Sequence, residues 1–194
     1  MRFIKYFCLF LLLQGCGSNY EWGWYILSPN NVEGLTNLKF LISGITTTIY
    51  ISVISIVLAM LIGLVVALPS LSNNRLLSYF NIAYVEIVRA VPLLVLILWI
   101  YYGLPIMMGV SFSPFVSGII ALTISESAFQ AEIFRAGINS INRGQHEVAG
   151  SLGMDFWKKM RFVILPQAIK VVLPALGNQF VHVLKMSSLV SIIG

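Results

Sequence analysis

Charged residues are scarce in this sequence. Only 10% of its 194 residues are Asp, Glu, Lys or Arg, whereas 58% are hydrophobic, and the mean hydropathy is +0.90. A soluble domain carries about 25% charged residues, so too few charges are present to cover a water-soluble globule of this size. Intrinsic disorder is excluded as well, because it requires low hydrophobicity and high charge. The composition predicts a single membrane domain.

Cysteine is rare, and the phosphate-binding loop of ATPases is missing. The two cysteines, Cys8 and Cys16, both lie near the N-terminus, so the sequence implies neither a disulfide framework nor a metal site. No segment fits the pattern G-x-x-x-x-G-K-[ST], whose backbone cradles nucleotide phosphates. We therefore expect a chain that is not an enzyme and that does not hydrolyse ATP itself.

The basic excess is small and is spread between apolar runs. The chain has 12 Lys and Arg against 7 Asp and Glu, a net charge of +5. A nucleic-acid-binding protein gathers its basic residues on one solvated face, whereas basic residues between apolar runs orient a protein in the membrane. We therefore expect a lipid bilayer as the surroundings and no nucleic-acid partner.

The sequence contains several long apolar runs. About 20 mainly apolar residues are needed to cross the hydrocarbon core. Four runs approach or exceed this length: 40–68, 91–108 (with a start as early as 82), 114–134 and 171–193. The fourth is the weakest candidate because Pro174 interrupts it. The prediction is an all-α, polytopic membrane protein with four spanning helices.

The charges of the connecting loops predict the orientation. The loop 139–170 contains five basic residues, whereas the segment 17–38 contains only two acidic ones. Because loops rich in Lys and Arg stay in the cytoplasm, we expect 139–170 to be cytoplasmic and 17–38 to be an external segment.

Residues 1–16 have the layout of a secretory signal. Arg2 and Lys5 precede an apolar stretch, 7–13, and small residues follow it. Residues 13–16 also resemble the bacterial lipoprotein box, in which Cys16 would be lipidated after cleavage. The alternative is an uncleaved signal anchor, and the sequence leaves both open.

Two of the predicted spans carry specialised faces. In the first, Ser55, Ala59, Gly63 and Ala67 recur every four residues, a spacing that lets helix backbones approach closely and predicts a packing seam. In the third, one polar stripe consists of Thr123, Glu126, Ser127 and Gln130.

Glu126 lies near the middle of the third run, where a carboxylate is energetically costly. Such a residue marks either a substrate or ion pathway or a structurally partnered group. The structural alternative is a pair with Lys185 or a hydrogen bond to a neighbouring helix. The two interpretations carry about equal weight, and the polar stripe is our candidate for the substrate pathway.

The cytoplasmic loop is predicted to form a helical elbow. Asn142, followed three residues later by Gln145, favours an N-cap with a capping box. A short helix through 147–152 then ends at Gly153, which suits the left-handed conformation. Asp155 can cap a second helix, from 156 to about 164, which we expect to stop ahead of Pro166.

The elbow contains a motif that carries a family resemblance. Glu147-Val148-Ala149, then Gly153, then Val163-Ile164-Leu165-Pro166 is similar to the "EAA…G…I-LP" signature of ATP-binding-cassette (ABC) importer permeases. The resemblance extends over roughly residues 35–194 to permeases of polar amino-acid importers of the histidine/glutamine type. The segments that carry it are 44–48, 84–94, 101–105, 131–138, 164–168, 176–180 and 188–194.

The resemblance implies that the loop 139–170 forms a coupling helix docked on a separate ATPase subunit. In such a complex Glu147 would make polar contact with the ATPase, and Ala149 would allow close approach. Gly153 would make the turn, and Leu165 and Pro166 would end the elbow. Residues 39–194 would then be the importer-type transmembrane domain. In its pathway, Glu126 would suit a cationic amino acid or the α-amino group of any amino acid.

The resemblance also implies partners and a location. The partners would be a pair of ABC ATPase subunits that use the ATP, a second permease subunit that is identical or related, and an extracytoplasmic amino-acid-binding protein. The chain itself would hold no cofactor and would cross the bacterial inner (cytoplasmic) membrane several times.

Two alternatives are kept beside this hypothesis. The family normally has five spanning helices, so a chain with four is expected to be a shortened permease or a truncated, non-functional fragment. A self-contained channel or secondary carrier, with Glu126 as an ion site, is the other alternative. It would require inverted repeats or discontinuous helices in both halves, and the sequence shows no such symmetry.

Overall fold

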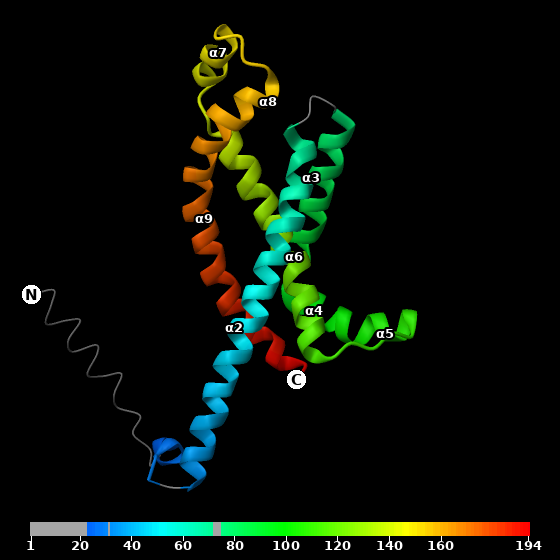
Figure 1. Cartoon of the computed structure of the whole chain (residues 1–194). Helices are drawn as coiled ribbons and strands as arrows, with labels where there is room; N and C mark the ends of the chain where they lie inside the picture. Colours follow the sequence, from blue (N-terminus) through cyan, green and yellow to red (C-terminus); the bar gives the residue numbers. More distant parts are fainter. Residues whose placement is uncertain (1–22, 31, 72–74) are drawn as a thin grey trace, which may run out of the picture. The chain divides into compact units, whose positions relative to one another are not determined.

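The computed structural model describes residues 23–30, 32–71 and 75–194, so the signal-like segment 1–16 and Cys16 lie outside the described residues. All regular secondary structure in the described part is helical, as predicted (Figure 1). The chain divides into two units, 1–45 and 46–194, which are described separately.

In the first unit, a short 3₁₀ helix precedes the first long helix. The 3₁₀ helix η1 is Gly23–Leu27, and α2 (Val32–Ala67) begins eight residues before the apolar run. The side-chain amide of Asn37 donates to the carbonyl of Ile26 at 3.0 Å. A Cβ on Gly34 would lie 1.9 Å from the carbonyl oxygen of Ser28, so this close return of the chain requires glycine.

The second unit contains the rest of α2 and the remaining helices. In chain order these are η2 (Leu68–Leu71), α3 (Arg75–Ala90), α4 (Leu93–Leu98), the π-helical η3 (Trp99–Gly103), α5 (Leu104–Met108), α6 (Pro114–Asn139), α7 (Arg143–Ser151), α8 (Phe156–Lys159), the π-helical η4 (Met160–Ile164), α9 (Leu165–Met186) and η5 (Ser187–Ile192).

Two helical stretches of the described chain are long and apolar enough to cross a membrane, α2 and the run Phe156–Ile192. A third candidate arises if Ser78–Ala90 and Leu93–Met108 form one broken span. Helix α6 has 26 residues, enough to span, but its polar stripe makes it less apolar than these. The fold is therefore that of a polytopic membrane protein with two to three candidate spans by length and composition, where the sequence predicted four.

The second predicted span is not one straight helix. Helix α3 ends at Ala90, Pro92 caps α4, and the two parts are bent by 90°. Proline lacks the N–H that would continue the helix and disfavours helical geometry in the residue before it. The predicted run from 91 corresponds to α4, which begins at Leu93, and the preceding helix α3 begins at Arg75, seven residues before the earlier start at 82.

The second helix of the elbow does not stop ahead of Pro166, which corrects the sequence prediction. One helical stretch runs from Phe156 through Pro166 and Pro174 to Ile192. Just before Pro166, the π-helical turn η4 shifts the hydrogen bonding, so that the N–H of Leu165 bonds to the carbonyl of Met160, five residues back. This local rearrangement accommodates a residue that cannot donate a bond itself.

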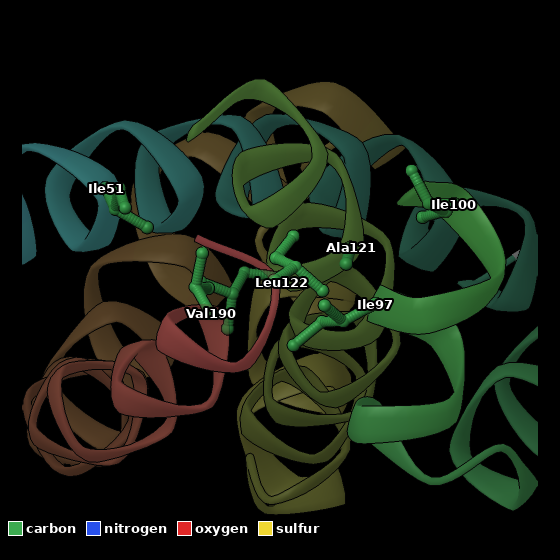
Figure 2. Close-up of a cluster of buried hydrophobic side chains, with 7 residues drawn as sticks. Ile51, Ile97, Ile100, Ala121, Leu122 and Val190 are labelled. Atoms are coloured by element: carbon green, nitrogen blue, oxygen red, sulfur yellow. The ribbon is translucent and has the colours of Figure 1, made fainter. Parts of the chain in front are cut away.

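Helix α6 lies at the centre of the second unit. It contacts α3, α4, η3, α9 and η5. Figure 2 shows its residue Leu122 among buried side chains from other segments: Ile51 of α2, Ile97 of α4 and Val190 of η5. The core of the unit therefore forms around α6, which fixes how the polar stripe on this helix is oriented.

The packing seam predicted on α2 is confirmed. Ser55, Ala59, Gly63 and Ala67 are all buried. A Cβ on Gly63 would lie 2.9 Å from both the Cβ of Gln130 and the backbone oxygen of Ser127. The absence of a side chain at Gly63 is therefore what lets α2 approach the polar stripe of α6.

Replacing Gly63 with alanine should force α2 and α6 apart. We expect Gly63→Ala to lower the free energy of unfolding by about 1–3 kcal/mol, the usual cost of overpacking, measured by thermal unfolding in detergent. The matched control is Gly177→Ala on α9, where an added Cβ meets no atom within 4 Å and alanine favours the helix. Equal melting temperatures for the two variants would contradict the seam.

Candidate functional site

The polar stripe of α6 is buried inside the helical packing. Thr123, Glu126, Ser127 and Gln130 are each at most 6% exposed. The four residues predicted from the sequence therefore share one enclosed face of the helix. Buried polar groups need hydrogen-bond partners, so the neighbours of this face define the site.

Glu126 is held by two side chains of α9. The amide of Gln179 donates to the Oε2 atom of Glu126, and the Nδ1 atom of His182 lies 3.3 Å from Oε1. Of the two structural alternatives, the hydrogen bond to a neighbouring helix is found and the pair with Lys185 is not. Lys185 is exposed and lies about 9 Å further along α9 than Gln179.

Gln179 and His182 were not predicted as site residues. Both stand out in the sequence as polar residues in an apolar run, three positions apart, which places them on one helix face. That spacing is the signal that could have found them. Which face α9 turns toward α6 depends on the packing of the two helices.

Tyr84 of α3 joins the stripe from the other side. Its hydroxyl lies 2.7 Å from the Oγ atom of Ser127, which itself donates to the carbonyl of Ile124 at 2.7 Å. Because the hydroxyl hydrogen of Ser127 is engaged, Tyr84 must be the donor to Ser127. The hydroxyl of Thr123 and the amide of Gln130 have no hydrogen-bond partner among the described residues. Part of the stripe is therefore open to another polar group.

A small pocket lies beside Gln179, the hydrogen-bond partner of Glu126. It has a volume of about 200 Å³, and its lining includes Arg89, Phe129, Glu132 and Gln179. The guanidinium carbon of Arg89 is 4.8 Å from the centroid of the Phe129 ring, within the range of a cation–π contact. Gln179 thus links the carboxylate of Glu126 to a pocket that contains an arginine.

The local structure of the elbow is largely as predicted. The side chain of Asn142 accepts from the N–H of Gly144 at 2.8 Å, and that of Asp155 accepts from the N–H of Lys158 at 2.9 Å. Gly153 has a φ of +73°, so it makes the left-handed turn. The predicted capping box is wrong, because the side chain of Gln145 accepts from Gln167 at 3.2 Å instead of closing on Asn142.

The structure separates the candidate coupling residues into two groups. Glu147, Gly153, Leu165 and Pro166 are exposed, whereas Ala149 is 1% exposed. Helix α7 packs against η4, so the close approach that Ala149 allows is to its own chain. Leu165 and Pro166 lie in the first turn of α9, and therefore in the middle of a continuous helical stretch.

Glu126 and Gln179 should be energetically coupled. We expect a double-mutant cycle with Glu126→Met and Gln179→Leu to give a coupling free energy of about 1–3 kcal/mol, because Gln179→Leu removes a donor from the buried carboxylate and Glu126→Met removes the acceptor of the Gln179 amide. Chemical unfolding in detergent measures it. The same cycle with Asn178→Leu, an exposed neighbour, should give a value near zero, and similar values in both cycles would argue against the contact.

Known proteins match most of the chain. Residues 55–194 match the family model described as "Binding-protein-dependent transport system inner membrane component". The chain is similar to the probable glutamine ABC transporter permease protein GlnM of Bacillus subtilis, with 40% identity over 81% of this chain and 72% of that protein. It is also similar to the arginine transport system permease protein ArtQ of Bacillus subtilis, with 33% identity over 82% of this chain and 73% of that protein.

A solved structure has the same fold. It is described as "Crystal structure of an amino acid ABC transporter with histidines" and matches with a TM-score of 0.76 and 42% identity, over 84% of this chain and 78% of that one. The solved structure agrees with the helical fold, and the family model covers most of the second unit. The chain therefore belongs to the family of inner-membrane components of binding-protein-dependent transport systems.

Proposed function

We propose that this chain is the permease subunit of an ATP-driven amino-acid importer and forms the translocation pathway. The family match over 55–194 carries this proposal, and relatives named for glutamine and arginine transport support the substrate class. Hydrolysis of ATP belongs to a separate pair of ATPase subunits. An extracytoplasmic binding protein supplies the amino acid, and a second permease subunit completes the pathway.

Four membrane crossings fit this role. Helix α6 turns its polar stripe toward α2, α3 and α9, and a helix can cross a bilayer with polar residues when they face the interior of a bundle. The 90° bend between α3 and α4 then makes one broken span. Discontinuous helices of this kind are tolerated where they line a cavity.

The elbow is the proposed coupling element. Helix α7 presents Glu147 together with Val148 and Leu152, which are 59% and 69% exposed. An exposed apolar and acidic helix face suits docking on another subunit. We assign Glu147 to polar contact with the ATPase. Gly153 turns the chain into the helical stretch that continues as α9.

The continuous stretch Phe156–Ile192 can transmit movement to the site. Its first turns are the second helix of the elbow, and its second half carries Gln179 and His182, which hold Glu126. Displacement of the docked elbow would tilt α9 against α6 and change the contacts of Glu126. The pathway residues Thr123, Glu126, Ser127 and Gln130 would then be opened or closed by the ATPase cycle.

Reversing the charge of Glu147 should uncouple the transporter. In proteoliposomes with ATPase and binding protein, we expect Glu147→Arg to reduce uptake by more than about tenfold, because like charges at a docking surface cost several kcal/mol. Insertion of the permease and binding of amino acid should be unchanged. The control is Glu33→Arg, another exposed acid outside the elbow. Undiminished uptake by Glu147→Arg would remove the docking role.

Replacing Glu126 should change the preference of the transporter between cationic and neutral amino acids. We expect Glu126→Gln to lower the uptake of arginine by about tenfold and that of glutamine much less, because a carboxylate contributes a charge-assisted bond to a cationic side chain. Competition between labelled arginine and glutamine measures the ratio, with the double variant Glu126→Gln, Gln130→Glu moving the carboxylate by one turn. Equal losses for both amino acids, or none, would remove the selectivity role.

A further inference from the structure

Arg89 is an exposed cation in the last turn of α3, without a carboxylate partner among the described residues. It lies 14 residues after the start of α3 at Arg75, about 21 Å along the helix, whereas the hydrocarbon core is about 30 Å thick. Among the described residues, no ion pair of Arg89 is found. An ionisable side chain at such depth is costly and is usually retained for function.

The groups around Arg89 neutralise it only in part. Glu132 lines the same pocket but is paired with Arg135 on its own helix. Glu86, one turn earlier on α3, lines a second hollow with Arg89, Glu132 and Arg135. The last turn of α3 contributes the partial negative charge of its carbonyls, and the face of Phe129 contributes a cation–π contact at 4.8 Å. No full negative charge is bound directly to the guanidinium.

The pocket beside Arg89 has the size of a small-solute site, and its lining is mostly apolar. Its volume of about 200 Å³ is room for about six or seven water molecules at roughly 30 Å³ each, which suffices for the charged head of an amino acid. Phe129 forms an apolar wall against the guanidinium and places its ring 6.4 Å from the ring of His182. Gln179 lines the pocket and donates to Glu126 on its far side.

We infer that Arg89 binds the α-carboxylate of the transported amino acid in the pocket formed with Phe129 and Gln179. A guanidinium fork pairs bidentately with a carboxylate, and such charge-assisted pairs are stronger than hydrogen bonds between neutral groups. The positively charged group of the amino acid then points past Gln179 toward Glu126. The site therefore has an anion-binding end on α3 and a cation-binding end on α6, as a zwitterion requires. This inference rests on the proposed function.

The test compares amino acids with their α-carboxamides, which keep the side chain and the amine but lose the carboxylate charge. The permease–ATPase complex is purified in detergent without the binding protein, so that only the membrane site is measured. Binding of labelled L-arginine and L-glutamine is then competed with L-argininamide and L-glutamine α-amide. We expect the wild type to prefer each acid, and Arg89→Gln to bind each acid about 10- to 100-fold more weakly, the usual loss for a hydrogen bond to a charged group.

The decisive result is the loss of discrimination. Arg89→Gln should bind acid and amide equally, and Arg89→Lys should retain part of the preference. The matched control is Arg161→Gln, because Arg161 also stacks on a phenylalanine, Phe162 at 5.7 Å, but lies outside the pocket. If the wild type binds no amino acid at all, the proposed function fails. If the wild type binds and Arg89→Gln keeps both the affinity and the preference, the carboxylate site is overturned and the function stands.

Discussion

The burial of one carboxylate between two apolar helices organises the second unit of this protein. Glu126 is 1% exposed, and a group of this kind is tolerated only where donors reach it. Both donors, Gln179 and His182, come from α9. The rotation of α9 about its axis and its register along α6 are therefore fixed by this contact, since a shift by one residue would replace Gln179 and His182 by Asn178 and Val181 or by Phe180 and Val183.

The same constraint explains the small residues of α2. A polar stripe on α6 must be covered by something that excludes water, and close backbone approach at Gly63 brings α2 directly onto Ser127 and Gln130. The helices that cover the stripe do not satisfy all of its hydrogen-bonding groups. The amide of Gln130 and the hydroxyl of Thr123 have no partner among the described residues. Each such group costs about 1–3 kcal/mol, a cost that a polar ligand entering the pathway would offset.

The features that could be predicted from the sequence are those that depend on residues close together along the chain. Apolar runs, the caps at Asn142 and Asp155 and the left-handed Gly153 are local features, and they are found where they were expected. The helix through Pro166 was missed because a π-helical turn, invisible in hydropathy, accommodates the proline. The partner of Gln145 lies 22 residues away and that of Glu126 lies 53 residues away. Such contacts require knowing which faces of two helices meet.

One helix connects the elbow to the site, and this has a consequence for transport. Gln167, near the start of α9, contacts Gln145 of α7, and Gln179 lies 12 residues later, about 18 Å along the same helix. Pro174 lies between the two contacts, but the helix continues through it, so a tilt of α9 at the elbow would also move the helix at Glu126. Because the elbow follows the ATPase and Glu126 faces the pathway in the proposed importer, one continuous helix would join energy input to the substrate site. A change that bends α9 between these two contacts would break that connection while leaving each end intact.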